Sequence, residues 1–500
     1  MSAAPGRPKQ ARSAARQGEG TLMSAAPGRP KQARTAARQG EGTLMSAAPG
    51  RPKLRSHRNA QHEGTPVSER LQVHLDFGAG STPLLLGECL WIPSESTSAF
   101  QWSASGLESG YRLSPLHLPL VNGVLKAPTH PFAGLHGIFN DSIPDGFGLR
   151  LMNRSLASAG YDLGRITPVD RLAWVGDRGL GALTYRPVVL GRSNRQLMDV
   201  SELGIHAVKA EAENFADVPD AVIKAGGSAH GARPKFWASV SSDGEKVILG
   251  DNLQTPNGFT ACLVKFAPAR GDKSEPFYEA ACLQLAEMVG VKAAKGRLLT
   301  HKHGAALAIE RFDRLPGGGR LFVQSLAALL HDDFRFPKLD YHHLAQVSRK
   351  LSGVTDAERI YRQCCFNVAL SMRDDHSKNF AFCMDKPGTW ELSPAYDLCP
   401  NEGPSGWQTM AVSGECRDIS RNHLLAFAEK LGLSISVAKD GIDKALSASS
   451  GFEALAVALG SQKSGAKKWS KNFREIAKRL APTVVAAGAK NSIKRSLGRS

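Results

Sequence analysis

The chain has 500 residues, of which 42% are hydrophobic, so it is long and apolar enough to bury large cores in two to four domains. No apolar run approaches the roughly 18 residues that a membrane-spanning helix needs, which excludes a membrane protein. The eight cysteines form no C-x-x-C pair, so neither a disulfide framework nor a zinc site is supported, and a reducing cytosol is the simplest compartment.

The net charge of +17 is concentrated at the two ends of the chain. Residues 1–58 hold 12 basic and 2 acidic side chains, and residues 461–500 hold 11 basic and 1 acidic. The remainder carries a net charge of −3, with 40 basic and 43 acidic side chains. An attraction to nucleic acid that is based on charge would therefore come from the ends.

The first 67 residues contain a repeat: MSAAPGRPKQARSAARQGEGTL at 1–22 recurs almost unchanged at 23–44. With few large apolar side chains, the segment 1–67 is predicted to be a disordered basic tail. Each copy contains P-G-R-P-K, which is similar to the core of a minor-groove AT-hook, so contact with DNA is one alternative. An organellar transit peptide is another. Each copy begins with Met, so translation could start at Met1, Met23 or Met45.

Short β-type runs punctuated by Gly and Pro predict a β-rich subdomain over 68–190. Within it, NDSIPDGFG is interpreted as a turn, and a helix is expected from Leu149 to about Gly160. Asp145 lies in this turn. We expect its carboxylate to bond its own backbone, in preference to a catalytic role.

The segment 191–312 is predicted to form an N-lobe that binds nucleotide phosphates. Its Gly-rich turn, AGGSAHGARPK, precedes a β-like run, although it contains neither G-x-G-x-x-G nor a Walker A sequence. Backbone N–H groups of such a turn can cradle phosphates. The candidate residues are Ser228, Ala229, His230 and Gly231.

Lys265 is the single charge in the apolar strand-like run TACLVKFAP. A snorkelling position at a sheet edge is possible, but a position in a cleft against the α- and β-phosphates is favoured. A helix over 275–289 is expected to pack behind this strand. Glu279 on that helix either pairs with Lys265 or lies in solvent.

The segment 313–465 is predicted to form a helical C-lobe that carries the order R-D-x-x-x-x-N at Arg373, Asp374 and Asn379. This spacing is typical of a kinase catalytic loop, in which the Asp accepts a hydroxyl proton and the Asn holds Mg²⁺. A predicted hairpin around a Pro-Gly turn would return Asp397 beside Asn379 as a second metal ligand. Lys378 could neutralise charge on the transferred phosphoryl group. Residues 466–500 are predicted to be a basic tail, with a basic amphipathic helix from Lys467.

Six stretches in this order resemble the HipA family of bacterial Ser/Thr kinases, the toxins of HipA–HipB toxin–antitoxin pairs. They are NDSIPDGFG, GSAHGARPK, LVKF, IERFDR, RDDHSKNF and SPAYDL. The likeness covers roughly residues 68 to 450. It implies an α+β, two-lobed protein-kinase-like fold with an added N-terminal β-rich subdomain and a mostly helical C-terminal lobe.

The resemblance also implies an ATP- and Mg²⁺-dependent Ser/Thr protein kinase. Ser228 matches the position at which HipA kinases phosphorylate themselves, after which the loop is ejected and the kinase is silent. The family's ERFDR sequence places Glu310 and Phe312 at the adenine, where the chain crosses between the lobes.

The expected partners are a HipB-like helix-turn-helix antitoxin, operator DNA through the antitoxin complex, and a protein substrate in translation such as an aminoacyl-tRNA synthetase. The expected location is the bacterial cytoplasm. Two alternatives stay open. One is a small-molecule phosphotransferase, since aminoglycoside-type kinases use a similar loop. The other is a non-catalytic module whose body binds the antitoxin and whose basic tails bind DNA.

Overall fold

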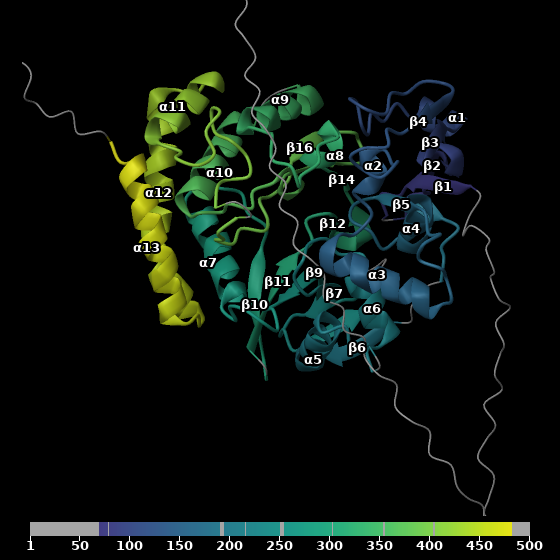
Figure 1. The fold of residues 1–500 in the computed structure, drawn as a ribbon, viewed down its shortest axis with the longest axis horizontal. Coiled ribbons are helices and arrows are strands. Elements are labelled where there is room, and N and C mark those ends of the chain that lie inside the picture. The colour runs from purple at the N-terminus through teal and green to yellow at the C-terminus, as the bar shows by residue number, and fades with distance from the viewer. Residues whose placement is uncertain are drawn as a thin grey trace, which may run out of the picture. The chain divides into compact units, whose positions relative to one another are not determined.

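The computed structural model describes residues 70–482, except 79, 191–194, 216, 251–254, 303, 354–355 and 404–405. Figure 1 shows how the helices and strands of this part are arranged. The expectations for residues 1–67 and 483–500 lie outside the described residues. Among the helices that are described, none is both long and apolar enough to cross a membrane.

The N-terminal subdomain, described from Arg70 to Leu190, is built on a five-stranded antiparallel sheet with the order β4-β3-β2-β1-β5. Helix α4 begins at a capping box formed by Thr167 and Asp170, and its Trp174 is completely buried. The elements are β1 (Leu71–Leu75), β2 (Leu84–Ile92), β3 (Thr97–Trp102), α1 (Ala104–Glu108), β4 (Val124–Lys126), α2 (Gly137–Asn140), α3 (Gly146–Ser158), α4 (Pro168–Val175) and β5 (Leu183–Arg186).

The N-lobe contains a second antiparallel sheet, of six strands in the order β10-β11-β9-β7-β8-β6. Successive side chains of a strand point to opposite faces. One face therefore packs Phe236 and Val264 in a core with residues of α5 and α6, and the other presents Lys235 and Lys265, directly opposite each other on β7 and β9. The elements are β6 (Gln196–Asp199), α5 (Val200–Glu211), α6 (Asp220–Gly226), β7 (Lys235–Ser241), β8 (Lys246–Leu249), β9 (Phe259–Phe266), α7 (Glu275–Met288), β10 (Gly296–His301) and β11 (Gly304–Glu310).

Helix α7 packs against β10 and β11, on the same side of the sheet as Lys265. The expected helix behind the lysine-bearing strand is therefore confirmed. Its buried residues include Glu279, Leu283 and Ala286, and Leu283 belongs to the same core cluster as Leu307 of β11.

The C-lobe is mostly helical, as expected. Helix α13 packs Trp469, Phe473 and Ile476 against α12 and α10, and its lysines face outward. The first part of the predicted basic tail is thus a packed helix. The elements are β12 (Arg314–Leu315), β13 (Gly319–Arg320), β14 (Phe322–Ser325), α8 (Leu326–Leu330), α9 (Tyr341–Ser352), α10 (Ala357–Ala369), β15 (Ala381–Met384), β16 (Trp390–Leu392), α11 (Arg421–Lys430), α12 (Ile435–Leu459) and α13 (Lys463–Leu480).

The hairpin predicted after Asn379 is confirmed. Strands β15 and β16 pair antiparallel, and Gly388 takes the positive φ of 92° that the turn between them requires. After β16 the chain runs back to Asp397, so the hairpin brings two residues that are 18 positions apart in sequence to one site.

A buried ionic network ties the crossing between the lobes to the N-terminal subdomain. The Asp313 carboxylate accepts hydrogen bonds from Arg311 at 2.7 Å, from Arg314 and from the backbone N–H of Gly181 at 2.7 Å. Both guanidinium groups also donate to the carbonyl oxygen of Gly179. These attractions hold the pKa of Asp313 below its usual range although burial alone would raise it.

Replacing Asp313 with Ala should lower the free energy of unfolding by about 3–5 kcal/mol, because two largely buried guanidinium groups lose their shared carboxylate. Urea denaturation at pH 7 would measure the loss. Asp162→Ala, in an exposed turn of the N-terminal subdomain, is the matched control. A loss no greater than that of the control would show that the network does not hold the crossing in place.

Candidate active site

Lys265 joins three segments of the chain in an ionic cluster, in which Lys265 and Glu279 are buried and the Asp397 side chain is 41% exposed. Its Nζ lies 2.6 Å from Oε1 of Glu279 on α7 and 2.6 Å from Oδ1 of Asp397. Burial alone would lower the pKa of Lys265, but the two carboxylates raise it, and Lys265 in turn holds the pKa of Asp397 below its usual range. The sequence left Glu279 either paired or solvated, and the structure shows that it is paired and buried.

The predicted catalytic loop follows helix α10, whose packing delivers the chain to Asp374. Asn379 Nδ2 donates to the backbone oxygen of Asp374 at 2.8 Å, which closes the five-residue loop. The Asp374 side chain is 50% exposed, and Nε2 of His376 lies 3.9 Å from its Oδ1. Partial burial and the nearby Asp397 carboxylate raise the pKa of Asp374, whereas His376 opposes this.

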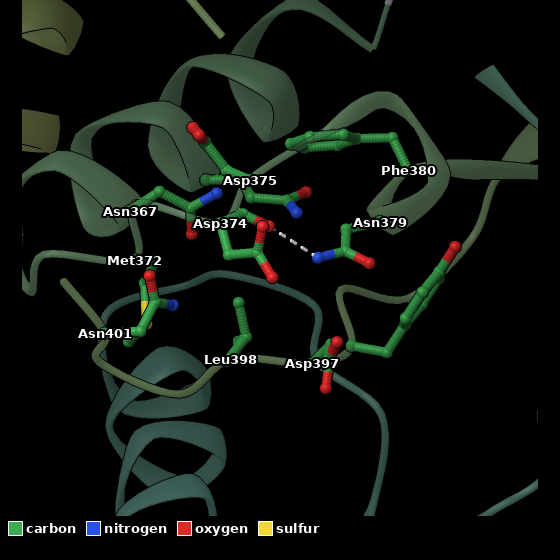
Figure 2. A pocket seen from close by; sticks show the side chains of 11 residues that line it. Asn367, Met372, Asp374, Asp375, Asn379, Phe380, Asp397, Leu398 and Asn401 are labelled. Atoms are coloured by element: carbon green, nitrogen blue, oxygen red, sulfur yellow. Dashed lines mark hydrogen bonds between the residues drawn. The ribbon is translucent and has the colours of Figure 1, made fainter. Parts of the chain in front are cut away.

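Figure 2 shows a pocket in which the side chains of Asp374, Asn379 and Asp397 face a common space. Asp397 has a φ of 57°, in the left-handed region that Asp tolerates better than most residues. It lies in the segment that leads back to the pocket after β16. The full lining is Gln363, Asn367, Met372, Asp374, Asp375, Asn379, Phe380, Tyr396, Asp397, Leu398 and Asn401.

The oxygen atoms of this pocket suit a Mg²⁺ ion that also binds water and phosphate better than a metal ion held by protein side chains alone. Because Asn379 uses its Nδ2 to bind the loop, its amide oxygen remains available, and Asp397 offers a carboxylate. No group of three or more His, Cys, Asp or Glu side chains within the described ranges is placed to hold a metal. Mg²⁺ usually takes one or two protein ligands and completes its shell with water and phosphate oxygens, which suits this pair.

Asp375 anchors a segment of the C-lobe against the catalytic loop, a role that the sequence did not reveal. Its buried carboxylate accepts hydrogen bonds from the hydroxyl of Tyr341 at 2.6 Å and from the backbone N–H of Thr409 at 2.8 Å. It also accepts from Gln408 and from the N–H of Met410. Asp375 thereby fixes residues 408–410 in place.

The Gly-rich turn lies near the catalytic loop, since Nδ1 of its His230 is 3.4 Å from Nζ of Lys378, and Ser228 is only 1% exposed. The carbonyl oxygen of Ser228 accepts a hydrogen bond from Trp237 Nε1 at 3.0 Å. Gly231 has a φ of 100°, which favours glycine, and a Cβ there would lie 2.4 Å from Nζ of Lys235. The preceding residue, His230, is partly buried, and this burial together with the nearby Lys378 lowers its pKa to about 4.

The expectation that the Asp145 carboxylate bonds its own backbone was wrong. Its Oδ1 accepts a hydrogen bond from the N–H of Gly231, and its Oδ2 lies 2.7 Å from Nζ of Lys378. Both contacts join residues more than 80 positions apart in sequence, so no local turn pattern could indicate them.

Lys235 was missed by the sequence analysis. It follows the Gly-rich turn directly, is 5% exposed and lies opposite Lys265 on the neighbouring strand. Its ammonium group has no ion pair or hydrogen bond with any described residue. Burial and the adjacent Lys265 lower its pKa, whereas Asp397, Glu279 and Asp145 oppose this. The available signal was a second lysine directly before a strand-like run, FWASV, that follows the turn.

The two adenine candidates lie in different places. Phe312 stacks on Tyr396 with ring centroids 5.7 Å apart, and the Tyr396 hydroxyl donates to the backbone oxygen of Lys378 at 2.8 Å. Glu310 ends β11 opposite Cys262, so the alternation of side chains puts it on the other face of the sheet from Lys265. Phe312 is therefore beside the pocket, and the Glu310 side chain is not.

Fold and site together define the class: a two-lobed, protein-kinase-like α+β protein with an added N-terminal β-rich subdomain. The model of the HipA-like C-terminal domain matches residues 227–481, and the model of the HipA N-terminal domain matches residues 86–186. The chain belongs to the HipA family.

Two known proteins illustrate the similarity. HipA of Shewanella oneidensis MR-1, solved in complex with HipB and its operator DNA, superposes with a TM-score of 0.60 at 19% identity, over 82% of this chain and 97% of that chain. The Sinorhizobium fredii (strain NBRC 101917 / NGR234) protein named "Putative kinase Y4dM" is 28% identical in an alignment of 145 residues that covers 26% of this chain. That alignment spans 35% of the length of the relative.

Burial raises the pKa of Asp375 to about 7, although its hydrogen bonds oppose the shift. A carboxyl group with a pKa raised by folding stabilises the protein fully below its unfolded pKa, near 4, and loses this contribution as the pH rises through 7. The free energy of unfolding falls by at most about 1.4 kcal/mol per pH unit in this range.

We predict that Asp375→Asn removes this part of the pH dependence of unfolding between pH 4 and 7, because the amide does not titrate. Urea denaturation of both proteins at several pH values would measure it, with Asp162→Asn as the control. An unchanged pH dependence would mean that Asp375 is ionised throughout this range.

Proposed function

We propose that this protein is an ATP- and Mg²⁺-dependent protein kinase that phosphorylates Ser or Thr residues. The observation that carries the proposal is the Lys265 ammonium held between Glu279 and Asp397, at a pocket that also contains Asp374 and Asn379. Lys, Glu and two metal-binding side chains in this arrangement are the parts that phosphoryl transfer requires in protein kinases.

In the proposed reaction, Asp374 accepts the proton of the substrate hydroxyl as its oxygen attacks the γ-phosphorus and the bond to the leaving ADP breaks. Its half-exposed position leaves room for a protein side chain, and its raised pKa suits a proton acceptor. Lys265 and Lys235 bind the phosphates from the sheet, while Lys378 faces the transferred group from the loop. Asn379 and Asp397 hold Mg²⁺, which when bound neutralises charge on the phosphate oxygens.

Autophosphorylation of Ser228 is the proposed off switch, on the strength of its place in the Gly-rich turn of a HipA family member. A phosphate there would add about −1.5 to −2 charges to a loop that binds the phosphates of ATP, and repulsion would oppose nucleotide binding. Because Ser228 is buried, the turn must open before its hydroxyl can be modified.

The proposed partner is a HipB-like antitoxin, with operator DNA reached through the complex, by analogy with the Shewanella oneidensis HipA that was solved together with HipB and its operator DNA. The family resemblance supports a substrate in translation, such as an aminoacyl-tRNA synthetase. A direct contribution of the basic ends to DNA binding would come from residues outside the described part and from the outward lysines of α13.

The proposed activity predicts that the wild-type protein, dephosphorylated first, gains one phosphate on incubation with ATP and Mg²⁺, mapped to Ser228. Asp374→Asn and Asp397→Asn should gain none. The first variant loses the proton acceptor, and the second loses the negative charge of a Mg²⁺ ligand. Intact mass and peptide mapping would measure this. Transfer of labelled phosphate to a small acceptor instead of protein would favour a phosphotransferase, and no transfer at all would contradict the proposal.

Lys235→Met should weaken nucleotide binding without lowering the stability of the protein. Because the Lys235 ammonium is buried beside Lys265 without a close partner among the described residues, the apolar replacement is expected to leave the free energy of unfolding unchanged or higher. It should weaken ATP binding at least tenfold by removing a charged hydrogen-bond donor to phosphate. Urea denaturation and calorimetric titration with ATP would test both parts. A less stable variant with unchanged ATP affinity would make Lys235 a purely structural residue.

A further inference from the structure

The start of helix α3 lies against the Gly-rich turn of the N-lobe. Asp145 is the N-cap of this helix, and Gly146–Gly148 are its first residues. Besides the contact from Asp145, the N–H of Phe147 donates to the carbonyl oxygen of Gly231 at 3.0 Å. A Cβ on Gly148 would lie 2.1 Å from the carbonyl oxygen of Ala229, so the two backbones approach each other too closely for any side chain there. The rest of helix α3 packs on α6, which leads into the Gly-rich turn (Figure 1).

Asp145 also reaches the catalytic loop. Its carboxylate bridges the N–H of Gly231 and Nζ of Lys378, and Nζ of Lys378 lies 3.4 Å from Nδ1 of His230 and 5.0 Å from the centre of the Phe334 ring. The Lys378 side chain is 11% exposed and that of Asp145 30%. Burial alone would raise the pKa of Asp145, but Lys378 and the other neighbours hold it below its usual range, so the carboxylate is charged.

We infer that Asp145 is a positioning residue of the nucleotide site, supplied by the N-terminal subdomain, which fixes the Gly-rich turn and Lys378 in the places where they meet phosphate. This inference rests on the proposed function and adds a residue to it. Asp145 itself does not contact the transferred group.

Opening of the Gly-rich turn then requires the Asp145 contacts to break. As long as Gly231 is hydrogen-bonded to Asp145 and Phe147, Ser228 stays buried, and its carbonyl oxygen accepts a hydrogen bond from Trp237. The N-terminal subdomain thus sets how readily the proposed phosphorylation site becomes accessible, and loss of the Asp145 charge makes the turn open more often.

The first test is hydrogen exchange of the full-length protein without nucleotide, which does not depend on activity. Asp145→Asn keeps the shape and one acceptor oxygen, and Asp145→Ala removes both. Exchange of the amides in residues 229–233 should speed up at least tenfold in Asp145→Ala and less in Asp145→Asn, since a hydrogen bond to a charged group is lost. Asp162→Asn removes one charge from an exposed turn of the same subdomain and should leave these amides as in the wild type.

Exchange that stays at the level of the Asp162→Asn control would overturn the inference. So would faster exchange throughout the N-terminal subdomain, because that pattern would show a general loss of stability. The melting temperature of each variant, measured in parallel, identifies the second case.

The second test is steady-state kinetics. Asp145→Asn should raise KM for ATP at least fivefold with a smaller effect on kcat. In a Lys378→Met background the same change should have a smaller effect on KM, because only the contact of Asp145 with the Gly-rich turn is then left to lose. An equal effect of Asp145→Asn in both backgrounds would contradict the inference. If the wild type transfers no phosphate, the proposed function fails, while hydrogen exchange still decides whether Asp145 holds the turn.

Discussion

The structure depends most on the buried charge of Lys265. A buried ammonium is costly unless carboxylates compensate it, and here Glu279 and Asp397 do so from two different lobes. This requirement brings together strand β9, helix α7 and the segment after β16, which are far apart in sequence. The second lysine, Lys235, leaves the charges of the site unbalanced. The two ammonium groups lie side by side on neighbouring strands, and only that of Lys265 has close ionic partners among the described residues. Such a surplus of positive charge is what the phosphates of a nucleotide would compensate.

The N-terminal subdomain is tied to the kinase-like body by two ionic links with different burial. The Asp313 network at the crossing between the lobes is almost completely buried and bonds backbone groups of the subdomain, as suits a permanent connection. The Asp145 link to Lys378 is partly exposed and adjoins a Gly-rich turn, so solvent and bound phosphate can compete with it. The first link would hold the subdomain and the crossing between the lobes together, and the second would break or form with the state of the proposed nucleotide site.

Asp375 shows how a neighbour of the proposed catalytic residue serves a different purpose. Asp374 and Asp375 are adjacent in sequence and both line the pocket, but the Asp374 side chain is half exposed, whereas Asp375 is buried and bonded to Tyr341 and residues 408–410. Because successive residues of an irregular loop point in different directions, two identical side chains have opposite environments. The buried carboxylate holds the loop, which leaves the exposed one free to take part in chemistry.

Sequence alone was sufficient for features that are local. The order of Arg373, Asp374 and Asn379, the Pro-Gly hairpin, the charged strand around Lys265 and the helix behind it all depend on short-range spacing, and the ordered motifs led to the HipA family and its two-lobed fold. Only the tertiary structure decided that Glu279 is paired, that Lys235 is buried beside Lys265, that Ser228 lies inside and that Asp145 contacts Gly231 and Lys378. The reason is physical: periodicity and turn chemistry act over a few residues, whereas ionic partners are chosen by packing between segments up to 233 positions apart.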